Sequence, residues 1–138
     1  MSKKKPTRVI ISGLGISGLI TAALLCKEKI KVECFEPSDI SKFCEDQRTT
    51  AFLKPAIDVF KKIGIWEKIE PISQPLKEME IIDAGNSKNG DIASVVFEPK
   101  EINIEYFGYN IPNNILRSEL LGWLKKNKSF VFNIGDSI

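Results

Sequence analysis

The amino-acid sequence predicts an α/β fold in which a parallel sheet built from βαβ units is interrupted by an inserted subdomain of antiparallel strands. Residues 8–36 have the pattern of a strand, a glycine-rich turn, a helix and a second strand. Residues 79–109 change to the two-residue alternation of strands, separated by turn-forming residues. A helical leucine stripe and a last apolar strand follow at 113–134, so we expect the chain to return to the parallel sheet after the insertion.

The first βαβ unit begins with a short strand. Arg8–Ser12 contains Val-Ile-Ile, which is typical of a buried strand. From Ile16 the apolar residues follow the three- and four-residue spacing of a helix, and apolar residues on its other faces predict that it is largely enclosed. Lys31–Glu36 returns to strand alternation and ends at Pro37-Ser38-Asp39. We therefore expect two parallel strands joined by an enclosed helix.

The next segment predicts a polar loop followed by helices. Residues 46–50, DQRTT, are polar and precede a helical pattern. Pro55 suits the first position of that helix, and Gly64 suits the residue just beyond its end. Trp66 then opens a short amphipathic stretch that Pro71 and Pro75 close.

The inserted subdomain is predicted from three strand-like runs, which are Met79–Asp83, Ser94–Phe97 and Ile102–Tyr109. Turn-forming residues separate them at Gly85-Asn86-Ser87, Asn89-Gly90-Asp91 and Pro99-Lys100. Because the connections are short, we expect antiparallel neighbours. The 138 residues are thus read as one domain, with a sheet-forming portion at 1–76 and 110–138 and an insertion at 77–109.

A helix and a strand complete the predicted order. Asn113 or Asn114 is expected to cap the helix, because asparagine side chains satisfy free amides at helix starts. The helix carries one apolar stripe, formed by Leu116, Leu120 and Leu124. Phe130–Ile134 is the last predicted strand.

Composition narrows the functional classes. A net charge of +2, spread over segments of mixed sign, gives no support for nucleic-acid binding. The chain has no histidine, and its three cysteines lack metal-ligand spacing, so we expect no metal site. Free cysteines also favour a reducing cytoplasm. No apolar run approaches the roughly 18–20 residues of a membrane span, although peripheral contact with a membrane stays open.

The glycine turn is the first candidate functional motif. Gly13, Gly15 and Gly18 fit G-x-G-x-x-G between a strand and an apolar helix. In such a turn the first glycine permits the bend, the second lets the backbone approach a diphosphate, and the third packs the helix closely. The amides of Ile16 and Ser17, at the helix start, would also face the phosphates. The alternative is a purely structural glycine turn.

Glu36 supports the hypothesis that the glycine turn binds a nucleotide. It ends the second strand, 18 residues after Gly18, close to the spacing of about 20 at which an acid meets a ribose hydroxyl. An acid at this position favours FAD or NAD over NADP. The sequence therefore predicts a Rossmann-like dinucleotide site, the alternative being a glutamate that faces solvent.

Two arginines carry further candidate roles. Arg117 is expected in the first turn of its helix, where a cation opposes the helix dipole unless an anion is bound nearby. Pairing with Glu119 or with solvent is the alternative. Arg48 lies in D-Q-R, where it either binds an anion or forms a loop salt bridge with Asp46.

Three stretches carry a family resemblance. These are "GLGISG" with Glu36, "DQRTTAFLKPAIDVFKKIGIWEKI" and "FGYNIPNNILRSELLGWL". They resemble consecutive N-terminal segments of flavin-dependent aromatic hydroxylases, in the branch of the ubiquinone-biosynthesis hydroxylases, which is similar to para-hydroxybenzoate hydroxylase in fold. The resemblance covers nearly the whole chain, and its second and third stretches are more specific than the glycines.

The resemblance implies a cofactor and an activity. It implies FAD in the glycine turn, with Glu36 on the adenosine ribose, Arg48 near the diphosphate, and Arg117 against the ribityl and diphosphate region. In the family, NADPH and O₂ are used to hydroxylate a polyprenylated phenol, and the antiparallel strands belong to the substrate subdomain. In such enzymes the cofactor carries out the redox steps, and the protein binds and orients it. No catalytic residue is therefore assigned on this chain.

The chain departs from the family in length. Family members are roughly two to three times longer, and two later FAD-binding segments have no counterpart here. We therefore expect a partial FAD-binding fold, truncated at its C-terminus and inactive alone. Three readings stay open: a shortened or split gene product, a chain that pairs with a separately encoded C-terminal portion, and a fragment of a longer enzyme. The alternative class is a dinucleotide-binding module without catalysis.

Overall fold

A parallel sheet of three strands forms one layer of the molecule in the computed structural model, which describes residues 7–83 and 93–135. The strands are β1 (Arg8–Ser12), β2 (Lys31–Glu36) and β8 (Phe130–Ile134), in the order β1-β2-β8. Ile11 of β1 pairs with Cys34 of β2, which pairs in turn with Phe132 of β8. The predicted α/β class and its parallel βαβ sheet are confirmed.

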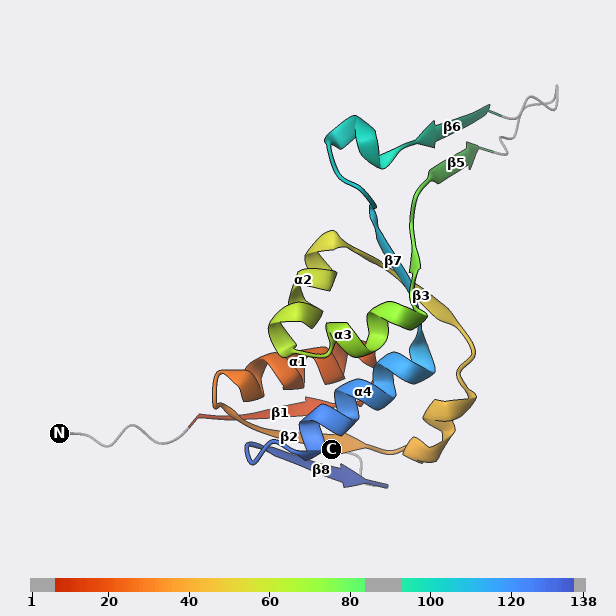
Figure 1. The fold of residues 1–138 in the computed structure, drawn as a ribbon. Helices are drawn as coiled ribbons and strands as arrows, with labels where there is room; N and C mark the ends of the chain where they lie inside the picture. The colour runs from red at the N-terminus through yellow and green to blue at the C-terminus, as the bar shows by residue number, and fades with distance from the viewer. Residues whose placement is uncertain (1–6, 84–92, 136–138) are drawn as a thin grey trace.

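The helices lie on one side of this sheet (Figure 1). Helix α1 (Ile16–Lys27) connects β1 to β2, and α4 (Asn113–Lys125) packs beside α1 and leads into β8. The predicted leucine stripe of α4 is completely buried, as its three members have no exposed surface. On the other side of the sheet, Ile10 and Val131 are each 55% exposed. The core therefore lies between the sheet and its helices.

A second, antiparallel sheet contains β3 (Thr49–Leu53), β7 (Gly108–Pro112) and β4 (Gln74–Pro75), in the order β3-β7-β4. Strand β3 was not predicted, because two of its five residues were assigned to a polar loop. The predicted strand at Ile102–Tyr109 is also wrong, since the strand begins only at Gly108.

A short 3-10 helix explains the second error. The helix η3 (Pro99–Ile102) is closed by a capping box, in which Glu98 and Glu101 each bond the other's backbone. It ends at Asn103, which takes a left-handed φ of 56°. The predicted strand therefore cannot begin at Ile102, because η3 includes Ile102 and the left-handed Asn103 turns the backbone away from an extended course.

The helical segment between β3 and β4 follows its sequence signals. Helix α2 (Lys54–Ile63) has Pro55 at its start and Gly64 beyond its end, where Gly64 takes a φ of 92° that favours glycine. The short helices α3 (Trp66–Ile69) and η2 (Glu70–Ile72) complete the segment, as predicted from Trp66 and the prolines. A further 3-10 helix, η1 (Ile40–Glu45), was not predicted.

The start of α4 corrects the predicted cap. The residue before the helix is Pro112, and no side chain caps it. The amide oxygen of Asn113 accepts a hydrogen bond from the Thr50 hydroxyl at 2.7 Å, and that of Asn114 accepts one from the amide of Ile115. Both asparagines are thus inside the helix, because Pro112 fixes the extended backbone that precedes it.

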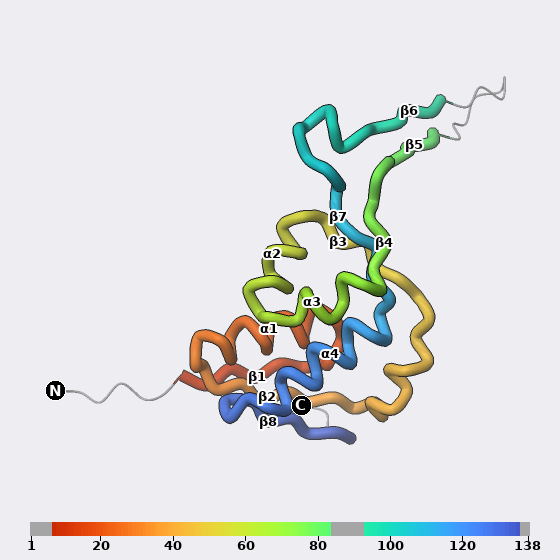
Figure 2. Tube along the Cα trace, viewed as in Figure 1, coloured from red at the N-terminus to blue at the C-terminus, as the bar shows by residue number. Residues whose placement is uncertain are grey.

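The remaining strands, β5 (Met79–Asp83) and β6 (Ala93–Phe97), form an antiparallel hairpin that projects from the body (Figures 1 and 2). Both strands were predicted. The turn residues predicted at 85–87 and 89–91 lie outside the described residues. The division into 1–76, 77–109 and 110–138 stays a prediction. Within the described part of the chain, no helix is long and apolar enough to cross a membrane.

Candidate functional site

The glycine turn joins β1 to α1 at the carboxyl end of the parallel sheet. Gly13 takes a φ of 93°, which favours glycine, and its amide donates to the carbonyl of Phe35 at 2.7 Å. A β-carbon at Gly18 would collide with the carbonyl oxygen of Gly13. The first and third glycines therefore have the structural tasks that the motif predicts: they permit the bend and bring the helix close to it.

Gly15 differs from both, because a β-carbon there would meet nothing within 4 Å. Gly15 is also the residue before α1, with an extended backbone at φ −63° and ψ 172°. No side chain caps this helix, and its first turn contains no acidic residue. The amides of the first turn and the positive end of the helix dipole thus face open space, which is the arrangement that binds anions.

A pocket of about 230 Å³ opens at this helix start. It is lined by Gly15, Ile16, Ser17, Asp46, Arg48, Asn113 and Arg117. Five of the eight candidate residues from the sequence therefore meet in one place. Gly13 and Gly18 shape the turn behind it, and Glu36 lies beneath the turn.

Arg48 comes to the pocket from the loop before β3. Its amide, Nε and NH2 groups all donate to the carboxylate of Asp46, with the two side-chain bonds at 2.7 and 2.9 Å. The alternative of a loop salt bridge is thus present in the structure, at the pocket itself. These hydrogen bonds hold the pKa of Asp46 well below its usual range and raise that of Arg48. The side chain of Arg48 is still 81% exposed.

Asn113 attaches the Arg48 loop to α4. Its backbone amide donates to the carbonyl of Arg48 at 2.9 Å, and its side-chain amide lies 3.4 Å from Asp46. The sequence suggested Asn113 only as a helix cap, so its place in the pocket was missed. Nothing in the local pattern shows it, because the contact joins segments more than 60 residues apart.

Arg117 reaches the pocket from α4, but not from its first turn. Because the helix starts at Asn113, Arg117 is its fifth residue, so the dipole argument applied to it is weaker than predicted. The predicted alternative pairing with Glu119 is wrong, since Glu119 pairs with Lys68 at 3.0 Å.

The surroundings of Arg117 leave one polar atom without a partner. Its guanidinium lies 3.7 Å above the ring of Phe43, and NH1 is 3.6 Å from Asp46. The side chain is only 17% exposed, and its Nε is buried and has no hydrogen-bond partner among residues 7–83 and 93–135. A buried guanidinium with an unsatisfied donor is costly unless an anion meets it, so this group fits a phosphate ligand.

Glu36 is buried, which excludes the alternative of a glutamate facing solvent. Its side chain is 8% exposed, and its two oxygens accept hydrogen bonds from the amides of Leu14 at 2.7 Å and Ser38 at 2.9 Å. Burial opposes ionisation, but these two amides and the nearby Arg117 outweigh it and lower the pKa. Glu36 therefore holds the glycine turn to the end of β2, a structural task that the sequence did not reveal.

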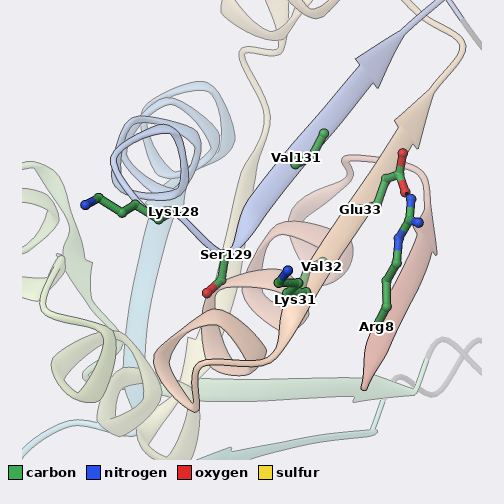
Figure 3. Close-up of a pocket in the computed structure, with 7 residues that line it drawn as sticks. All are labelled: Arg8, Lys31, Val32, Glu33, Lys128, Ser129 and Val131. Atoms are coloured by element: carbon green, nitrogen blue, oxygen red, sulfur yellow. Dashed lines mark ion pairs between the residues drawn. The ribbon is translucent and has the colours of Figure 1, made fainter. Parts of the chain in front are cut away.

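A larger hollow of about 390 Å³ lies elsewhere on the sheet (Figure 3). There Arg8 and Glu33 face each other across β1 and β2 as an ion pair. This hollow is lined by Lys31, the first residue of β2, and by Ser129, the residue before β8, so it lies at the amino ends of these strands. Ligands of open α/β sheets bind at the carboxyl ends of the strands. The smaller pocket beside the glycine turn is therefore the stronger candidate.

The buried cysteines are core residues rather than reactive groups. Cys26 and Cys34 are 2% and 0% exposed. Burial and the neighbouring Cys26 raise the pKa of Cys34 to about 11, which suppresses its thiolate. Among residues 7–83 and 93–135, no group of acidic, cysteine or histidine side chains could hold a metal ion.

Comparison with known proteins finds one curated relative and several solved structures of similar fold. No protein-family model matches the chain. Among curated proteins, the 3-demethoxyubiquinol 3-hydroxylase of Escherichia coli is 22% identical over 139 residues, covering 97% of this chain and 34% of that protein. The chain thus spans about one third of the length of the curated relative that it matches.

Solved structures share the fold. A variant of PqsL from Pseudomonas aeruginosa matches with a TM-score of 0.67 at 24% identity, covering 94% of this chain and 33% of that one. Another PqsL structure, titled "a probable FAD-dependent monooxygenase", matches at 0.63 and 18%, again over 94% and 33%. The p-nitrophenol 4-monooxygenase PnpA of Pseudomonas putida matches at 0.64 and 16%, over 94% and 32%. The predicted resemblance to the N-terminal part of flavin-dependent hydroxylases is confirmed.

Proposed function

We propose that this chain is the FAD-binding portion of an aromatic-ring hydroxylase that uses NAD(P)H and O₂ and acts on a polyprenylated phenol in ubiquinone biosynthesis. The observation that carries the proposal is the convergence of three anion-binding features on one pocket. These are the uncapped start of α1 and the side chains of Arg117 and Arg48, which line the pocket. The similarity to a ubiquinol hydroxylase and to FAD-dependent monooxygenases supports FAD as the dinucleotide.

The residues of the pocket fit a diphosphate. The space in front of Gly15 is one that any side chain would fill, so glycine is the residue that leaves it to a ligand. The backbone amides of Gly15, Ile16 and Ser17 would donate to the phosphate oxygens, and Arg48 and Arg117 would neutralise their charge. When bound, FAD supplies the redox chemistry, while the protein binds and orients it.

Glu36 is proposed to bind the adenosine ribose while it holds the turn. Each oxygen of its carboxylate accepts one backbone hydrogen bond. Each carboxylate oxygen has two lone pairs, so a ribose hydroxyl can donate to the carboxylate without displacing either amide. Because its pKa is lowered, Glu36 is ionised near neutral pH and acts only as an acceptor.

A second candidate is a dinucleotide-binding module without catalysis, or a split-gene product that needs a separately encoded partner chain. The chain spans about one third of its relatives' length, so the activity of the whole relatives is not carried over to it. We propose that the isolated chain binds FAD weakly and does not oxidise NADPH. A cytoplasmic location is proposed, with peripheral contact at the inner membrane through a lipophilic substrate.

Calorimetric titration with FAD tests the site. Gly15→Val is expected to abolish binding, since its branched side chain fills the space in front of the turn. Gly122→Val is the matched control, because Gly122 also has nothing within 4 Å of an added β-carbon but lies away from the pocket on α4. Unchanged FAD affinity in Gly15→Val would contradict the site.

NADPH oxidation tests whether the isolated chain is active. A stable yellow protein that consumes NADPH faster when a phenol is added would show that the isolated chain is an enzyme. FAD binding without NADPH oxidation is the result we expect of both candidates.

A further inference from the structure

Asp46 is an anion placed inside a pocket whose other features attract anions. Its side chain is only 10% exposed, and it lies between the guanidiniums of Arg48 and Arg117. We propose that Asp46 competes with the ligand's phosphate, because it occupies the Nε–NH2 edge of Arg48 and neutralises part of the charge that would attract a phosphate. This inference rests on the proposed function, which places phosphates in the pocket.

The hydrogen bonds around Asp46 occupy groups of Arg48 that a phosphate would also bind. Nε and NH2 of Arg48 donate to its two oxygens at 2.7 and 2.9 Å, in a two-point contact. Arginine makes the same two-point contact with phosphate. A phosphate that binds the Nε–NH2 edge of Arg48 therefore displaces the Asp46 carboxylate, whereas one that binds the NH1–NH2 edge shares the guanidinium with it.

The two arginines depend on Asp46 to different degrees. The side chain of Arg48 is 81% exposed and donates its two side-chain hydrogen bonds within the described residues to Asp46. The side chain of Arg117 is 17% exposed, lies 3.7 Å above the ring of Phe43 and is 3.6 Å from Asp46. Loss of the carboxylate would thus release Arg48 for a ligand while packing keeps Arg117 in place.

The balance of charge gives the direction of the effect. Asp46 cancels part of the attraction of the two guanidiniums for a phosphate. Replacing it by asparagine keeps the size of the side chain and removes the charge. With the screening of bulk water, one charge several ångströms away changes anion affinity by roughly threefold to tenfold, and a lower effective dielectric near the protein raises that figure. We expect this gain to exceed the loss from releasing Arg48, because an ion pair with an exposed arginine contributes little stability.

The test is a calorimetric titration of the wild type and of Asp46→Asn with inorganic diphosphate. We expect the variant to bind diphosphate roughly threefold to tenfold more tightly. Asp58→Asn is the matched control, because it changes the net charge equally but lies on α2 and lines a different hollow; its affinity is expected to equal that of the wild type. Equal or weaker binding by Asp46→Asn overturns the proposal, as does the absence of binding in both proteins.

An Arg48→Gln background separates competition from a structural effect. There the gain from Asp46→Asn is expected to shrink to less than half, since the Nε–NH2 edge that Asp46 releases is absent. A gain of unchanged size overturns the proposal. If Asp46→Asn does not fold, Asp46→Ser is measured in its place with the same expectations.

Titration of the same proteins with FAD distinguishes the two proposals. Tighter diphosphate binding by Asp46→Asn without FAD binding by any protein would refute the proposed function and leave the competition intact. FAD binding without a gain in diphosphate affinity would refute the competition alone.

Discussion

Strands with alternating apolar residues occur both in the body of the molecule and in the projecting hairpin, but they are half-buried in the body and exposed in the hairpin. In β2 every second residue is buried, because α1 and α4 cover one face of the sheet. In β5 and β6 every residue is exposed, although Met79 pairs with Phe97 and Ile81 with Val95 to place apolar residues on one face. Alternation in sequence thus predicts a strand, whereas burial depends on what covers it.

This contrast has an energetic consequence. A strand gains stability mainly from the apolar area that it removes from water, and a two-stranded hairpin alone is marginal. The stability of this protein should therefore reside in the body, with the hairpin contributing little. The nucleotide pocket belongs to the body, so its geometry depends on the same packed elements.

The largest expected effect comes from removing a core side chain of the body. Leu120→Ala should lower the free energy of unfolding by about 2–5 kcal/mol, because Leu120 is completely buried on α4 and its loss leaves a cavity. Denaturant unfolding followed by circular dichroism measures the change. Leu53→Ala is the control, since Leu53 is 51% exposed and should cost far less. Similar costs for the two variants would break the contrast between packed and uncovered positions.

A smaller effect is expected at the glycine turn. Gly18→Ala should destabilise the body by about 1–3 kcal/mol, because the new methyl group collides with the backbone of Gly13. Gly122→Ala is a matched helical control with open space around it, and it should be neutral or stabilising by up to about 1 kcal/mol. Thermal unfolding compares the two. A neutral Gly18→Ala would show that the turn moves aside easily.

Glu36 is expected to make the free energy of unfolding depend on pH. Glu36→Gln should cost about 1–2 kcal/mol at neutral pH, since the hydrogen bonds from Leu14 and Ser38 lose their charged acceptor. Its pKa in the folded protein lies below the ordinary 4.5. The stabilisation is therefore fully present above about pH 4.5 and is lost as the pH falls through the folded value.

Urea unfolding of the wild type and of Glu36→Gln between pH 7 and pH 3 measures this dependence. The difference between the two proteins should shrink toward the acidic end. Glu67→Gln, on the short helix α3, is the control and should show no comparable difference. A difference that stays constant with pH would mean that the charge of Glu36 does not stabilise the turn.

The sequence predicted what local signals determine. The βαβ unit, the ends of α2 at Pro55 and Gly64, and the strands of the hairpin follow from spacing and turn chemistry. Strand β3 was missed because it pairs with β7, more than 50 residues away, and its own sequence is partly polar. The strand expected from Ile102 does not begin there, because Ile102 lies in η3 and the next residue, Asn103, has a left-handed backbone.

The residues of the candidate site also fall into those that local signals predict and those that tertiary contacts bring together. The glycines and both arginines were found from motif and resemblance, and five of the eight candidates line one pocket. Asp46 was foreseen only as a salt-bridge partner, and Asn113 only as a cap. Their shared position, like the burial of Glu36 beneath the turn, results from tertiary contacts that no local spacing encodes.

The smallest effect is expected in the hairpin, where it gives the most direct check of the comparison. Ile81→Ser should change the free energy of unfolding by less than about 0.5 kcal/mol, because Ile81 is already 55% exposed and gives up little buried area. Amide hydrogen exchange adds a local measurement: β5 and β6 should exchange much faster than β2, which lies between two strands. A large destabilisation by Ile81→Ser, or protection of β5 equal to that of β2, would mean that the apolar face of the hairpin is covered in solution. The hairpin would then belong to the packed structure and not stand apart from it.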